Sequence, residues 1–290
     1  MSTHPYLSAI APIQVEAMLA SLPMYDLPEV RDATNTIWSN IRARLHARIP
    51  GLPLELDRTK TREAQWRHAG LILSQTCGYP LRFHFREHLR VIGAPRYSAP
   101  GCDGHDYSSE LVVRNRGRVH LGEFRGSVLA VNGIDSQSGY NAVKATLHTA
   151  GFENSTHQPF FGQMKVSGTH RASIGLVRRG EADIAAIDAV SLALIRTHAP
   201  GELEGLHVIH HSPAAPSLPC VTSARTSDTT VIELRNAIKA MLTDPALAFA
   251  RNVLQLVRLD NVGMREYERI DTMTLESGNL VLAPEDLASQ

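Results

Sequence analysis

Apolar runs of strand length alternate with segments of helical periodicity along most of this chain. A helical pattern begins near Pro28, and its apolar positions are Val30, Ala33, Ile37, Ile41 and Leu45. Because they lie three and four residues apart, they share one core-facing surface of a helix. The same spacing predicts a long helix from about Thr229, with its apolar face formed by Val231, Leu234, Ile238 and Met241.

The apolar runs between the helical segments predict strands. They lie at 18–23, 70–75, 89–97, 107–114, 127–133, 165–170, 182–188, 206–213 and 219–224. Further helices are predicted at 81–89, from about Ser138, and at 171–180. Regular alternation of strands with helices is typical of an α/β fold with largely parallel sheets, which is the fold class we predict.

Two polar segments divide these elements into groups. Residues 99–110 (APGCDGHDYSSE) and 196–205 (RTHAPGELEG) are rich in residues typical of loops and separate neighbouring strand–helix groups. We expect the chain to pass between two lobes at these points. The first lobe would be discontinuous, comprising 1–107 plus 204–290, and the second lobe, 108–203, would be inserted into it.

Composition and charge limit the possible functions. Hydrophobic residues make up 43% and charged residues 20% of the 290 residues, as in globular proteins with sizeable cores. Twenty-nine basic residues balance 29 acidic residues, so no overall field favours nucleic acid or an anionic membrane. We therefore expect no nucleic-acid partner, and any preference for anions must come from a local site.

The sequence also bears on location and cofactors. No stretch approaches the roughly 20 apolar residues that span a bilayer, so no membrane insertion is expected. Residues 1–19 lack a basic start followed by an unbroken apolar run, which predicts a cytoplasmic protein as written, or a periplasmic one if a leader was removed. Cys77, Cys102 and Cys220 are too few and too scattered for a disulfide framework or a zinc site. No metal or other cofactor is predicted.

Candidate binding residues follow the ends of several predicted strands. In open α/β sheets, ligands bind beyond the carboxyl ends of the strands. Small, hydroxylated or ionisable residues gather at these ends, where one cleft is expected. They are Tyr25, Thr76, Cys77, Gly78, Ser136, Gln137, Ser138, Gly139, His170 and Asp188.

The stretch from Ser136 to Gly139 has two possible roles. A helix start offers free N–H donors and a partial positive charge, which suit phosphate, phosphonate, sulfate or carboxylate. The hydroxyls of Ser136 and Ser138 could add donors, and Gly139 would allow close backbone approach. Alternatively, one serine is an ordinary N-cap, worth ~1 kcal/mol of helix stability. Both roles can coexist.

Three ionisable residues leave alternatives open. His170 begins a predicted helix and could donate to an anion, or it could be a surface or capping histidine. Asp188 follows a buried run, so its carboxylate needs a partner, either a ligand group or the start of the next helix. Cys77 lies at a strand end, and would be catalytic only with a nearby base and a lowered pKa. No serine-hydrolase elbow, Walker loop or dinucleotide fingerprint is present.

Several stretches resemble one known family. They are EFRGSVLAVNGIDSQSGYNAVKATL, VSGTHRASIGLVRRGEADIAAIDAVSLALI, LILSQTCGYPL and IGAPRYSAPGCDGHDYSSELVVR. In order and spacing they resemble the phosphate, phosphite and phosphonate substrate-binding proteins of ABC importers. The resemblance extends from about Leu22 to Ser223. It implies a type II periplasmic-binding-protein fold, with two α/β lobes, two crossover strands and a ligand held between them.

The resemblance also implies roles for individual residues. In the family, a serine-rich loop at a helix start holds the anionic head group, and it corresponds here to Ser136–Gly139. The family's histidine and acidic residue correspond to His170 and Asp188, and contacts from the first lobe to Tyr25 and the stretch Thr76–Gly78. Family members often carry threonine where this chain has Gln137, whose longer amide could reshape the anion site.

Three functions follow as hypotheses. The first is a non-catalytic protein that binds a small anionic solute by closure of the two lobes, with an ABC permease as its partner. The second is an enzyme on the same fold, with Cys77 or His170 as the reactive group. The third is a cytosolic sensor that presents its closed state to a partner protein.

Overall fold

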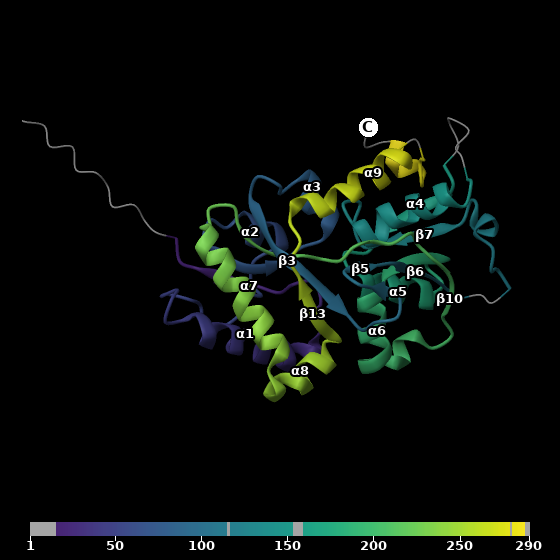
Figure 1. Ribbon diagram of the computed structural model, residues 1–290. Coiled ribbons are helices and arrows are strands. Elements are labelled where there is room, and N and C mark those ends of the chain that lie inside the picture. Colours follow the sequence, from purple (N-terminus) through teal and green to yellow (C-terminus); the bar gives the residue numbers. More distant parts are fainter. Residues whose placement is uncertain (1–15, 115–116, 153–158, 279, 288–290) are drawn as a thin grey trace, which may run out of the picture.

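Two mixed sheets, each covered by helices, form most of the molecule. The computed structural model describes residues 16–114, 117–152, 159–278 and 280–287. Residues 1–15, which include most of the stretch predicted to lack a leader, lie outside the described residues. Figure 1 shows α1, α7 and α8 gathered around one sheet, and α4, α5 and α6 around the other.

The first sheet has the strand order β1-β2-β12-β3-β13. Its strands are Leu19–Ala20, Leu71–Gln75, Cys220–Ser223, Leu89–Tyr97 and Leu256–Asp260 in that order. Its helices are α1 (Arg31–Leu45), α2 (Arg62–Arg67), α3 (Gly78–Phe83), α7 (Asp228–Thr243) and α8 (Ala248–Val253). As predicted, the apolar faces of α1 and α7 are buried. They form one core with residues of the sheet such as Leu73 and Ile92.

The second sheet has the order β10-β6-β9-β7-β8. Its strands are His207–His211, Ser109–Val113, Ile184–Asp188, Val128–Val131 and Gln163–Val166 in that order. Helix α4 (Ala142–Thr149) packs on one face of this sheet, whereas α5 (His170–Arg179) and α6 (Ala189–His198) share a core on the other. Short helical turns lie between these elements: η1 (Pro28–Val30), η2 (Leu121–Phe124), η3 (Gln137–Asn141), η4 (Pro200–Leu203), η5 (Pro245–Leu247) and η6 (Met264–Tyr267).

The chain passes from the first sheet to the second within the predicted segment 99–110. The predicted segment 196–205 is not a passage, because β10 follows it and still pairs with β6 of the second sheet. The chain returns to the first sheet between β10 and β12. A small sheet of β4 (Cys102–Asp103), β5 (Asp106–Tyr107) and β11 (Ala215–Pro216) lies on these passages. A third passage was not predicted. After β13 the chain forms α9 (Glu268–Glu276), which Figure 1 shows reaching toward α4, and α10 (Pro284–Leu287) contacts β8. The lobe boundaries at 108 and 203 stay a prediction.

The α/β class and the mixed sheets are confirmed, but the expectation of mostly parallel sheets is wrong. Within the described residues, parallel pairing joins β1 to β2 and β7 to β8 and β9. The other pairings are antiparallel, including those of β12 and β6 with both of their neighbours. Parallel neighbours arise from strand–helix–strand crossover units. β6 and β12 do not belong to such units, because each is the strand by which the chain enters its sheet from the small sheet of β4, β5 and β11. Apolar runs reveal strands but carry no information on direction.

The helix after β2 is shorter than predicted. The predicted helix at 81–89 has the wrong bounds, because α3 ends at Phe83 and Leu89 already belongs to β3. Pro80 lies in the first turn of α3, where proline is well tolerated. Among the described helices, none is long and apolar enough to cross a membrane.

Candidate functional site

A cavity of about 550 Å³ lies between the two sheets, and both contribute to its walls. Six of the ten residues singled out from the sequence line it: Tyr25, Cys77, Ser136, Ser138, His170 and Asp188. The other four, Thr76, Gly78, Gln137 and Gly139, are buried next to these residues but do not line the cavity. Strand ends from both sheets therefore meet at one cleft, as their position in an α/β fold predicts.

The loop that follows β7 presents the start of η3 to this cleft. Ser136 is the N-cap of η3, because its Oγ accepts a hydrogen bond from the Gly139 amide at 3.0 Å. Gly139 has no room for a side chain, since a Cβ atom there would lie 1.8 Å from Asn132 Oδ1. The capping interpretation of Ser136 is therefore correct, and Gly139 is required by packing within the loop.

The protein's own atoms satisfy part of this helix start. The Gln137 amide donates to Cys77 Sγ at 3.4 Å, and the Gly139 amide donates to Ser136. Within the part of the chain that the structure describes, no acceptor is found for the Ser138 amide. The expected set of free donors thus reduces to this amide and the serine hydroxyls beside it.

Ser138 and His170 form a pair inside the cleft. The Ser138 hydroxyl and His170 Nε2 hydrogen-bond at 2.8 Å, which joins the loop after β7 to the first turn of α5. Burial lowers the pKa of His170 to about 4. The imidazole is therefore neutral at physiological pH, and it can act as a hydrogen-bond partner but not as a cation.

Asp188 ends β9 and has two partners. Its Oδ1 accepts from the Ser191 amide at 2.8 Å, which caps α6, and its Oδ2 accepts from the Tyr25 hydroxyl at 3.0 Å. Burial raises the pKa of Asp188 to about 6, against the effect of these hydrogen bonds. The Tyr25 contact also connects the segment after β1 of the first sheet with the second sheet.

Cys77 is the N-cap residue of α3, and its thiol is buried. Burial raises its pKa, although hydrogen bonds from the Gln137 and Tyr79 amides oppose the shift. A nucleophilic cysteine needs the opposite shift, because the thiolate is the reactive form. The environment of Cys77 therefore favours a protonated, weakly accepting thiol.

Three predicted residues contact other parts of the protein instead of the cleft. The Gln137 carboxamide accepts from Asn141 Nδ2 at 2.8 Å, and its nitrogen lies 3.8 Å from Met273 Sδ in α9. A Cβ atom on Gly78 would lie 2.3 Å from Ile270 Cδ1, also in α9. The Thr76 hydroxyl donates to the carbonyl of Cys77 at 3.3 Å. Gln137 and Gly78 are thus fitted to α9, which sequence reasoning did not predict.

Sequence reasoning missed other residues of the cleft. Arg62 and Trp66 line it from α2, and Asn132 and Asp135 line it from the loop after β7. Tyr107 of β5 does not line the cavity but is buried next to Ser138, one of the residues that do. Asn132 lies at the end of the predicted strand 127–133, and Asp135 follows it. Tyr107 lies where the polar segment 99–110 overlaps the predicted strand 107–114. Arg62 and Trp66 could not be found in this way, because α2 does not follow a predicted strand.

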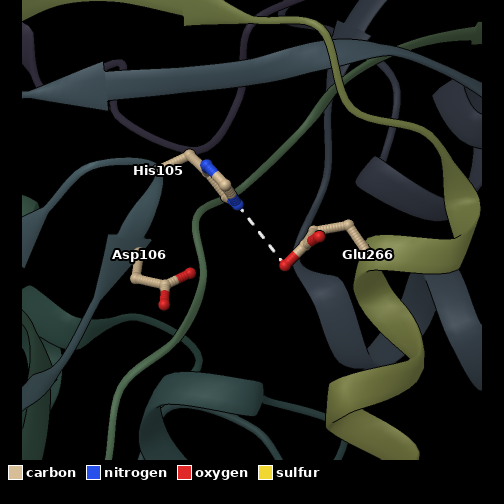
Figure 2. Close-up of side chains that lie close together, drawn as sticks. All are labelled: His105, Asp106 and Glu266. Atoms are coloured by element: carbon tan, nitrogen blue, oxygen red, sulfur yellow. Dashed lines mark ion pairs between the residues drawn. The ribbon is translucent and has the colours of Figure 1, made fainter.

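Another cluster could be mistaken for a metal centre. His105, Asp106 and Glu266 each offer a ligand atom, and these atoms lie within 4.8 Å of one another. Figure 2 shows His105 directed toward Glu266, with Asp106 beside them. However, Arg269 contacts both Asp106 oxygens at 2.8 Å and Glu266 at 3.0 Å.

Because Arg269 donates to both carboxylates, a cation that bound them would have to displace it. His105 in turn lies 3.1 Å from Asp260, the last residue of β13. These residues form an ion-pair network between the β4–β5 hairpin and the segment that leads into α9. The prediction that no cofactor is bound stays a prediction.

Comparison with solved structures identifies the fold. PhnD1 from Prochlorococcus marinus, solved in complex with methylphosphonate, has 16% identity and a TM-score of 0.69, covering 91% of this chain and 99% of its own. A binding protein component of an ABC phosphonate transporter from Pseudomonas aeruginosa, PA3383, has 13% identity and a TM-score of 0.67, with coverage of 91% and 87%. XAC2383 from Xanthomonas citri, bound to chloride, has 14% identity and a TM-score of 0.65, with coverage of 90% and 97%.

These identities establish the likeness of fold alone, which is that of type II periplasmic binding proteins. A search of curated proteins found no significant relative. The sequence profile of one family, described as "ABC transporter, phosphonate, periplasmic substrate-binding protein", matches residues 84–267. This match includes the loop after β7, His170 and Asp188, and it confirms the resemblance seen in the sequence. The chain belongs to the family of phosphonate periplasmic substrate-binding proteins of ABC transporters.

Proposed function

We propose that this substrate-binding protein holds a small phosphonate- or phosphate-like anion in the cleft between the two sheets. The observation that carries the proposal is the convergence of the free Ser138 amide, the Ser138 hydroxyl and neutral His170 on one cavity. Backbone amides at a helix start favour anionic oxygen, and hydrogen bonds to charged acceptors are stronger than neutral ones.

Each residue would have a distinct task. Ser138 would donate to one ligand oxygen through its amide and to another through its hydroxyl. His170 would orient that hydroxyl, because its Nε2 already lies within hydrogen-bond distance. An anionic oxygen accepts hydrogen bonds far better than a thiol sulfur, so the ligand would take the Gln137 amide from Cys77.

Asp188 would tune the charge of the site. Its raised pKa of about 6 means that protonation needs only mildly acidic conditions. A protonated carboxyl can donate to a ligand oxygen, whereas the carboxylate repels it. The contact of Asp188 with Tyr25 would let the ligand interact with groups of both sheets at one point.

We further propose that the parts assigned above to 1–107 plus 204–290 and to 108–203 are the two bodies that close on the ligand. Hinge closure of this kind needs few connections between the bodies. The chain passes between the sheets within 99–110, between β10 and β12, and after β13. The family supports action in the periplasm with an ABC permease as partner. An enzyme that uses Cys77 is disfavoured, since burial raises the pKa of its thiol.

Calorimetry on ligand-stripped protein tests the proposal. Methylphosphonate, aminoethylphosphonate, phosphite, phosphate and sulfate would be titrated separately, so that the preferred class is identified. Ser138→Ala should weaken binding of the preferred anion by about tenfold or more, because it removes a charge-assisted hydrogen bond. Ser98→Ala, which alters an exposed serine away from the cleft, is the matched control. Absence of heat with every anion would refute the proposal.

A further inference from the structure

Arg171 lies at the rim of the cleft between two carboxylates. Its Nη1 and Nη2 donate to Glu29 at 3.0 and 2.7 Å, and its Nε donates to Glu202 at 2.9 Å. All three side chains are about 30% exposed. Arg171 thus forms charge-assisted hydrogen bonds with two carboxylates. Its positive charge is already neutralised by these protein groups before any ligand enters.

The two carboxylates come from different parts of the fold. Glu29 lies in η1, which leads directly into α1, and α1 packs in the core of the first sheet through Ile37 and Trp38. Arg171 is on α5, which packs in a core of the second sheet. Glu202 lies in η4, which contacts α5. The Arg171–Glu29 pair therefore spans the cleft, and the Arg171–Glu202 pair does not.

Apolar contacts lie next to the ion pair that spans the cleft. Val30, which follows Glu29, is buried in one cluster with Val190 and Leu194 of α6. Leu27 and Pro28, just before Glu29, line the cleft itself. The segment 27–30 therefore contacts the second sheet through a salt bridge at the rim and through buried side chains behind it.

We propose that the Glu29–Arg171 pair is a latch that holds the cleft closed and slows release of the ligand. This inference rests on the proposed binding function. Arg171 would act as a positioning residue, because both of its partners are protein carboxylates. Breaking the pair would favour the open form without removing a ligand contact. An open form releases ligand faster, so the effect should appear in the dissociation rate.

The matched variants Glu29→Gln and Glu202→Gln test this latch. Each removes one carboxylate from the same arginine, but only the first breaks the pair that spans the cleft. In stopped-flow measurements with methylphosphonate, we expect Glu29→Gln to accelerate dissociation about threefold, as befits a partly exposed pair, and to reduce its dependence on salt. Glu202→Gln should leave both nearly unchanged. Equal acceleration by the two variants, or by neither, would overturn the proposal.

A second measurement needs no ligand. Small-angle scattering of the ligand-free protein should give a larger radius of gyration for Glu29→Gln than for the parent and Glu202→Gln, with thermal stability recorded for all three. Identical radii would reject the latch. If the parent binds no anion but Glu29→Gln expands, the binding proposal fails, whereas the role of the Glu29–Arg171 pair in holding the cleft closed stands.

Discussion

Gly139 shows how one residue is constrained by the loop around it. Asn132 Oδ1 occupies the space that a side chain at 139 would need, and the same loop holds the Ser136 cap and the Ser138–His170 pair. A change at Gly139 must therefore move atoms that are part of the candidate site. The glycine has no φ in the left-handed region, so close approach is its reason for being there.

Gly139→Ala should destabilise the protein by about 1–3 kcal/mol, as overpacking of a closely packed region does. Chemical denaturation would measure the loss. Gly201→Ala is the matched control, because no atom lies within 4 Å of a Cβ atom there and its φ is not positive. Equal stability of the two variants would show that the loop adapts at little cost.

His170 and Asp188 should give opposite dependences of stability on pH. The pKa of His170 falls from 6.5 to about 4 on folding, so its contribution is present above pH 6.5 and is lost as pH falls toward 4. The pKa of Asp188 rises from 3.8 to about 6, so its contribution is present below pH 3.8 and is lost as pH rises through 6. Between pH 4 and 6 the two effects offset each other.

Single variants would separate these two effects. Relative to the parent, the stability of Asp188→Asn should increase with pH between 4 and 6, and that of His170→Asn should decrease. Each slope is at most about 1.4 kcal/mol per pH unit. Urea denaturation at several pH values measures both. Profiles parallel to that of the parent would mean that neither group has the shifted pKa.

At the scale of elements, the start of η3 combines helix capping with the candidate anion site. Ser136→Ala removes the acceptor of the Gly139 amide and should cost about 1 kcal/mol of stability. Because the loop then loses its fixed shape, anion affinity should fall as well. Ser227→Ala removes the N-cap of α7, whose hydroxyl accepts from the Thr230 amide.

Ser227→Ala should therefore lower stability by a similar amount and leave anion affinity unchanged. Denaturation and calorimetry on both variants make the comparison. If the two variants weakened binding equally, the loss would reflect general destabilisation, and a special role for the η3 cap would be contradicted.

Strands and helices were largely predictable, because apolar periodicity records which faces are buried. The ends of the predicted strands also identified six residues that line the cleft. Periodicity does not record the direction of a strand. The expectation of parallel sheets is therefore wrong at β6 and β12, which pair antiparallel with their neighbours. Nor does periodicity show that Gln137 is directed toward Met273, since that contact joins segments 136 residues apart.

At the scale of the whole molecule, one apolar cluster connects the two sheets. Tyr25 and Val30 pack in it with Tyr107 of the connecting hairpin and with Leu194 of α6. The surfaces buried there belong to neither sheet alone. Unfolding of one sheet would expose apolar area on the other, which favours a single cooperative transition.

Leu194→Ala tests this coupling. Leu194 is completely buried, so truncation should cost about 2–5 kcal/mol. We expect calorimetry to show one transition for the parent and one, at lower temperature, for the variant. Two resolved transitions in the parent would show that the sheets unfold independently.

The return of the carboxyl-terminal segment to the second sheet bears on how this chain matures. Leu280 and Leu282 are buried in the same core as Leu129 and Val131, which are synthesised some 150 residues earlier. A nascent chain lacks these two leucines while the roughly 150 residues after Leu129 and Val131 are being made, so that core stays incomplete over this interval. Completion of this core is therefore expected only after Leu282 has been synthesised, and a chain terminated before that residue would present an apolar gap that quality-control machinery can recognise.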